Sequence, residues 1–139
     1  MAVFLSVKKE FAKEDNSMHK ELKVWGRELS LKIIFDVFDG EDILIEQHEA
    51  LDAFLAQASE LLADSKAIEE YCVKNSNGSV VAPVDNLFKY VIPTAVYVRR
   101  KTDLREIALL CDFKFDEESG CALVFQNEAL TKICSQEEL

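Results

Sequence analysis

Apolar and polar residues alternate in the stretches that we expect to form strands. Every second residue of the stretch 29–38 is apolar, and these positions are Leu29, Leu31, Ile33, Phe35 and Val37. A period of two is typical of a strand with one buried face. A shorter strand is predicted over residues 21–25. Gly26 and Arg27 lie between the two stretches, and they predict a tight turn and an antiparallel hairpin.

The hydrophobic period changes to 3.6 residues after Asp42, which is the expected N-cap of a helix. The residues expected to face the core of this helix form one stripe: Leu44, His48, Leu51, Leu55, Ala58 and Leu62. Such spacing predicts an amphipathic helix. A second helix is predicted over residues 66–74, and the turn-forming residues 75–79 mark its end.

The last third of the chain is rich in strand patterns. Strands are predicted over residues 94–99, 106–115, 121–125 and 130–133, and residues 116–120 form a hairpin turn in which Gly120 supplies a positive φ. Strands and helices are segregated along the sequence, which favours an α+β fold over a parallel βαβ sheet. We therefore predict an α+β fold with a largely antiparallel twisted sheet and two central helices packed on one face.

A chain of 139 residues has the length of one domain, and no linker or internal repeat divides it. We predict a single domain over residues 1–139, in which residues 1–20 form a peripheral N-terminal segment. The expected core consists of Trp25, Ile33, Phe35, Leu51, Phe54, Leu55, Leu109, Cys111, Phe113 and Phe125.

Charge is distributed unevenly along the chain. The 26 acidic and 16 basic residues give a net charge of −10. Residues 28–70 carry twelve acidic groups against two lysines, so the excess is concentrated in one stretch. Binding of nucleic acid without sequence preference depends on Lys and Arg at the phosphates, so an acidic chain argues against a nucleic-acid partner.

The polar face of the first predicted helix carries Glu46, Glu49 and Asp52. These carboxylates could belong to an ordinary solvent-exposed helix face. They could also form a recognition surface, because a concentrated negative field speeds encounter with a basic partner and disfavours wrong partners.

A second group of carboxylates surrounds the predicted C-terminal hairpin turn. Asp112, Asp116 and Glu118 could simply favour the turn, or they could hold a divalent cation and support a metal-dependent enzyme. Their order does not match a calcium-binding loop. The chain has no glycine-rich phosphate loop and no hydrolase motif, so no catalytic residue and no cofactor are predicted.

Compartment is inferred from cysteines and apolar runs. The four cysteines are spaced by 39, 10 and 13 residues, so no CxxC pair exists. The apolar stretch 2–7 is too short for a signal peptide, and no apolar run is long enough to cross a bilayer. We therefore expect reduced thiols, a cytoplasmic protein and no membrane partner.

A resemblance emerges in the C-terminal third. Residues 109–122 follow the pattern L-x-C-D-x-x-F-D-x-E-x-G-x-A. This resembles a loose family of small bacterial cytosolic proteins of unknown function, whose signature runs roughly L-x-C/D-x-x-W-D-x-E-H-G-x-A. Residues 25–27, 45–51 and 131–137 are also similar to segments of that family. Where the family often has Trp and His, this chain has Phe115 and Ser119, which puts any metal or catalytic role of the motif in doubt.

The resemblance implies an α+β fold and an interaction role of the kind suspected for bacterial toxin-immunity proteins. Together with the acidic helix, it leads us to expect a non-enzymatic interaction module whose acidic face binds a basic protein, such as a toxin nuclease domain. The divalent-metal site remains the alternative, and the oligomeric state is left open.

Overall fold

The computed structural model of the protein describes residues 12–13 and 18–139. Within these residues the chain forms a seven-stranded sheet, two α-helices and two short 3₁₀-helices. In chain order these elements are β1 (Ala12–Lys13), β2 (His19–Val24), β3 (Arg27–Asp36), α2 (Ile45–Leu61), α3 (Lys66–Asn75), η1 (Leu87–Lys89), β4 (Val91–Val98), β5 (Glu106–Phe113), β6 (Cys121–Gln126), β7 (Ala129–Ser135) and η2 (Gln136–Glu138).

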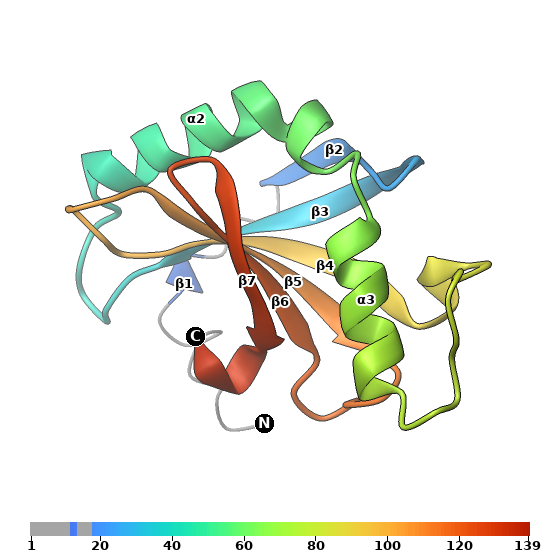
Figure 1. Cartoon of the computed structure of the whole chain (residues 1–139). Coiled ribbons are helices and arrows are strands. Elements are labelled where there is room, and N and C mark those ends of the chain that lie inside the picture. The colour runs from blue at the N-terminus through green and yellow to red at the C-terminus, as the bar shows by residue number, and fades with distance from the viewer. Residues whose placement is uncertain (1–11, 14–17) are drawn as a thin grey trace.

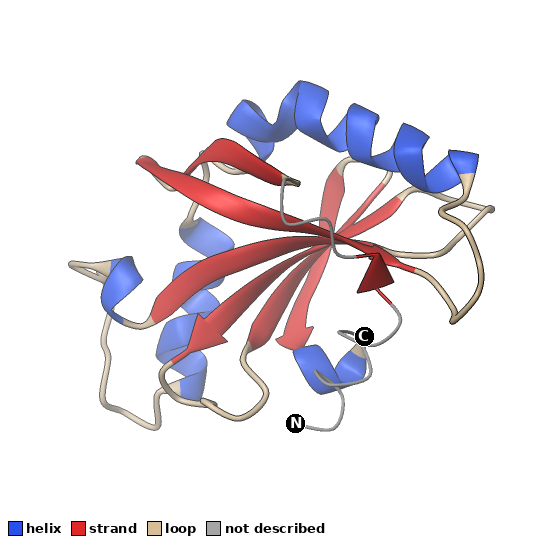
Figure 2. Ribbon diagram, turned by 180° about the vertical axis from the view of Figure 1, so that it is seen from behind, coloured by secondary structure: helices blue, strands red, loops and turns tan. Residues whose placement is uncertain are grey.

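The strand order is β1-β3-β4-β5-β6-β7, and β2 also pairs with β3. All pairs are antiparallel except β3 and β4, which are parallel because the connection between them passes through both α-helices. The strands fan out through the twist of the sheet (Figure 1, Figure 2). The α+β prediction with a largely antiparallel sheet is therefore confirmed.

One face of the sheet forms the main core with α2 and α3. The inward positions predicted for β3 and its extension are confirmed, since Leu31, Ile33, Phe35 and Val37 are all buried. The residues that α2 buries in this core are Gln47, Ala50, Leu51, Phe54 and Ala58. The same core includes Ile68 and Cys72 of α3, so both helices cover the same face.

One of the predicted inward positions is wrong: His48 is exposed, and Gln47 occupies the inward position of α2. The predicted N-cap Asp42 is also wrong, since the N-cap is Leu44. Leu55 is half-buried and packs against the main core. Trp25 is half-buried at the hairpin turn, where both Trp25 and Gly26 have positive φ angles of 47° and 87°. The turn therefore comes one residue earlier than predicted, and Trp25 packs against the edge of the main core.

The middle strands are also buried on the opposite face. A second apolar cluster there contains Ala95, Tyr97, Ala108, Leu110 and Ala122. Burial on both faces explains why the first six residues of β5, from Glu106 to Cys111, are all buried without alternation.

The prediction of a peripheral segment over residues 1–20 falls mostly outside the described residues. His19 and Lys20 are described, and they begin β2 by pairing with Lys32 and Leu31. Within the described chain, no helix combines the length and the apolar character that crossing a membrane requires.

Tyr71 makes the stability of the fold sensitive to alkaline pH. Its ring lies 5.5 Å from that of Phe113, and burial, helped by nearby acidic groups, raises the pKa of Tyr71 from 10.0 to about 12. The folded state thus favours the neutral phenol. Its stabilising contribution is complete below pH 10.0, the unfolded value, and is lost as the pH rises toward 12.

We expect the Tyr71→Phe variant to lose less stability than the wild type between pH 10 and 12. The difference should be about 1 kcal/mol, because solvent around a half-exposed ring weakens the effect. Urea unfolding at pH 8, 10 and 11 measures it. Burial also raises the pKa of Tyr97, so part of the alkaline loss should persist in the variant. Identical pH profiles for the two proteins would contradict this role of Tyr71.

Candidate functional site

The three carboxylates predicted to bind a partner lie on the first half of α2. Glu49 and Asp52 are exposed and Glu46 is half-buried. The structure divides this set into two parts. Glu46 and Glu49 line a surface hollow of about 460 Å³, whereas Asp52 lies on the same helix outside its lining.

The hollow brings together three segments that are distant in sequence. Its lining residues come from α2, from the β4–β5 loop and from the β6–β7 turn, and they are Glu46, Glu49, Ala53, Thr102, Asp103, Leu104, Arg105, Asn127 and Glu128. Four of them are carboxylates and one is a cation. We refer to this set as the acidic hollow.

Arg105 and the β6–β7 turn are held together by four contacts. Arg105 donates from Nε and Nη2 to the two carboxylate oxygens of Glu128, at 2.7 and 2.9 Å. The backbone N–H of Arg105 donates to Asn127 Oδ1, and the N–H of Asn127 donates to the Arg105 carbonyl. Asn127 and Glu128 adopt positive φ angles of 48° and 61°, as a two-residue hairpin turn requires.

This arrangement leaves negative charge in the hollow. The hydrogen bond with Glu128 and the charge of Glu128 raise the pKa of Arg105, and Glu49 contributes less. A bidentate guanidinium–carboxylate ion pair is geometrically specific, so the Arg105 side chain is held in its contact with Glu128. Within the described part of the chain, Glu46, Glu49 and Asp103 form no ion pair. The hollow can therefore offer three carboxylates to a cation from outside.

Gln47, to which the sequence analysis gave no role, anchors the helix that carries Glu46 and Glu49. Its side chain is fully buried and donates from Nε2 to the carbonyls of Asp36, at 2.8 Å, and Val98, at 3.2 Å. Its Oε1 accepts from the N–H of Leu44 at 2.9 Å. The signal in the sequence was a Gln three residues after the N-cap, which is a capping-box position.

Part of the acidic stretch 28–70 is neutralised by neighbouring arginines. Arg100 contacts the Glu41 carboxylate at 2.6 Å and donates to the Asp42 carbonyl at 2.9 Å. Arg99 lies 3.7 Å from Asp36 and 3.2 Å from the buried Glu106. These contacts hold the entry loop of α2 against the end of β4. The Asp36 and Glu41 carboxylates therefore make structural contacts, whereas Glu46 and Glu49 on α2 form no ion pair within the described residues.

The alternative metal ligands do not come together. Asp112 and Glu118 are exposed, whereas Asp116 is half-buried and its Oδ1 accepts from the N–H of Ser119 at 3.2 Å. In the described part of the chain, no three His, Cys, Asp or Glu side chains form a group that could hold a metal ion. No geometry here favours the metal-dependent alternative.

The rest of the C-terminal motif has structural contacts. Phe115, which replaces the Trp common in the resembling family, stacks on Tyr90 with ring centroids 5.7 Å apart. Gly120 has a φ of 65°, and its N–H donates to the Asp116 carbonyl at 2.7 Å. The motif therefore closes the β5–β6 hairpin.

The chain matches the model of a protein family described as a domain of unknown function (DUF6985) over residues 6–139. The chain therefore belongs to this family. No curated protein and no solved structure matches it.

Proposed function

We propose that this protein is a non-enzymatic interaction module that binds a basic protein partner through the acidic hollow. The observation that carries the proposal is the convergence of Glu46, Glu49 and Asp103 on one hollow, where Arg105 is bonded to Glu128 and none of the three forms an ion pair with another described residue. Two of these residues come from a rigid helix whose start is fixed by Gln47, so the carboxylates are positioned before a partner arrives.

The net charge of −10 supports the same conclusion at longer range. A negative field accelerates the encounter with a basic partner, and a hollow with three carboxylates can receive an arginine or lysine side chain. A toxin nuclease domain is one such partner, because carboxylates can occupy the positions of nucleic-acid phosphates on its basic surface. This part of the proposal rests on the resemblance to the family that includes suspected immunity proteins.

Charge reversal in the hollow tests the proposal. We expect the Glu46→Lys/Glu49→Lys variant to bind a fluorescein-labelled hexa-arginine peptide about tenfold more weakly at low salt, because like charges now meet. Asp52→Lys should have a smaller effect, since Asp52 lies outside the hollow lining. Fluorescence anisotropy gives the affinities, and the differences should shrink above physiological ionic strength.

A variant with the same change in net charge serves as the control. Glu28 and Glu60 are exposed and do not line the hollow, so Glu28→Lys/Glu60→Lys removes general attraction without altering the hollow. Both double variants should stay folded, because all four carboxylates reach solvent and such surface charges each change stability by only a few tenths of a kcal/mol. Equal weakening by the two double variants would show that the peptide senses net charge alone, and the proposal would then be wrong.

A further inference from the structure

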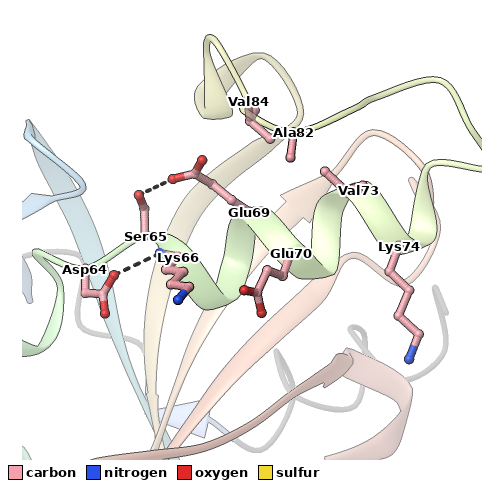
Figure 3. A pocket seen from close by; sticks show the side chains of 9 residues that line it. All are labelled: Asp64, Ser65, Lys66, Glu69, Glu70, Val73, Lys74, Ala82 and Val84. Atoms are coloured by element: carbon pink, nitrogen blue, oxygen red, sulfur yellow. Dashed lines mark hydrogen bonds between the residues drawn. The ribbon is translucent and has the colours of Figure 1, made fainter.

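A second hollow, separate from the acidic hollow, lies between α3 and the loop that follows it (Figure 3). Its volume is about 570 Å³. Val73 of α3 on one side and Ala82 and Val84 of the loop on the other form its apolar walls, and the rest of its lining is polar: Asp64, Ser65, Lys66, Glu69, Glu70 and Lys74. We call this space the α3 groove.

The walls of the α3 groove are apolar and accessible. Val73 and Val84 are only half-buried, Ala82 is exposed, and the neighbouring Val81 is 72% exposed. A hollow of several hundred cubic ångströms with apolar walls and a few polar groups has the size and character of a small-molecule site. A ligand that covers these apolar side chains removes their surface from water, which favours binding.

One carboxylate is held beside these walls. Glu69 Oε2 accepts a hydrogen bond of 2.5 Å from the Ser65 hydroxyl, which fixes the orientation of the side chain. Glu69 lies on the side of α3 that faces Ala82 and Val84, whereas the charged ends of Lys66, Glu70 and Lys74 are directed to the other side (Figure 3). The polar groups on the side of the apolar walls are therefore the Glu69 carboxylate and the Ser65 hydroxyl that is bonded to it.

The N-terminus of α3 does not make the groove a site for anions. A helix N-terminus attracts anions, but Asp64 Oδ1 already accepts from the N–H of Lys66 at 2.9 Å. Glu69 adds a second negative charge in the first turn. Lys66 and Lys74 also line the groove, but their charged ends are directed to the other side of α3. A negative head group beside the apolar walls would therefore meet the Glu69 carboxylate, whereas a cationic head group would be attracted by it.

We propose that the α3 groove binds a small aliphatic amine. The alkyl chain packs between Val73 on one side and Ala82 and Val84 on the other, which removes apolar surface of both partners from water. The ammonium group donates to the Glu69 carboxylate, which Ser65 holds in place. This site is independent of the acidic hollow, which has no comparable apolar walls.

Three six-carbon probes with different head groups test the proposal by titration of the ¹⁵N-labelled full chain at low salt. Hexylamine should cause saturable shifts of the amides of Val73, Ala82 and Val84, and it should bind more tightly than hexan-1-ol. Hexanoate should bind most weakly. Shifts confined to Glu46, Glu49 and Arg105 would place the amine in the acidic hollow, which would overturn the α3 site and leave the proposed function intact.

Two variants separate the contributions of the head group and the chain. Glu69→Gln should weaken hexylamine about threefold and leave hexan-1-ol unchanged, since a half-exposed ion pair is modest in strength. Val84→Ala should weaken the binding of hexylamine and of hexan-1-ol to the same extent, because it shortens the apolar wall that both alkyl chains contact. Glu117→Gln, which removes the same charge from the exposed β5–β6 turn, should affect neither. Equal affinity of the three probes, or an unchanged preference for the amine in Glu69→Gln, would overturn the proposal.

Discussion

Replacing Gly120 by alanine is expected to destabilise the protein by about 3 kcal/mol. A Cβ at this position would lie 2.4 Å from the carbonyl oxygen of Cys111, which belongs to the middle of the sheet and cannot move freely. It would also lie 2.8 Å from Gln136 Nε2, which donates to the same carbonyl. The φ of 65° adds a cost of about 1 kcal/mol for any residue with a side chain.

Gly40 provides a matched control for the cost of placing a side chain on a residue with positive φ. Its φ is also positive, at 79°, but a Cβ there would meet no atom within 4 Å. Gly40→Ala should therefore cost only about 1 kcal/mol. Urea unfolding gives the loss in free energy of unfolding for each variant. The larger loss in Gly120→Ala measures the steric cost of the close approach between the turn and β5. Equal losses in the two variants would show that the packing of the β5–β6 hairpin differs from that described above.

Replacing Gln47 by leucine should also cost about 3 kcal/mol. The substitution keeps a similar volume but removes the donor for the Asp36 and Val98 carbonyls and the acceptor for the Leu44 N–H. Buried backbone groups left without partners are each destabilising by about 1 kcal/mol or more. Thermal and urea unfolding followed by circular dichroism give the loss.

Gln57 is the control for this prediction, because it lies on the same helix and is exposed. Gln57→Leu should change stability by less than about 0.5 kcal/mol. Gln47→Leu should additionally weaken hexa-arginine binding, since α2 would no longer be fixed at its start and Glu46 and Glu49 would be less well positioned. A stable Gln47→Leu variant would show that the buried amide is not the anchor of α2.

The carboxylates of the β5–β6 turn and those of α2 differ in their structural contacts. In the C-terminal motif, a close approach between the turn and β5 accounts for Gly120, and a hydrogen bond within the turn accounts for Asp116. Among the residues that the structure describes, Glu46 and Glu49 on α2 form no ion pair. Their arrangement is consistent with binding, and this is why the proposal places the partner site there.

Local pattern determined much of this fold. The alternation in residues 29–38 identified the buried face of β3, and a strand with one buried face has no other way to place its apolar side chains. The second helix was predicted over residues 66–74 and is found at Lys66–Asn75. The glycine at position 120 predicted a positive φ, which the structure confirms. In each case the cause is the chemistry of neighbouring residues in the chain.

Only the tertiary structure decided the features that depend on distant segments. The parallel pairing of β3 with β4 follows from the path of the chain through both helices. Gln47 replaced His48 on the inner face of α2 because two strand ends, at Asp36 and Val98, offered carbonyls to its amide. The acidic hollow has the same origin: Glu46 and Glu49 were visible in the sequence, but Asp103 and Glu128 reach them only through folding. Periodicity reports which side of an element is buried, whereas a hydrogen-bond partner or a shared hollow depends on which elements meet.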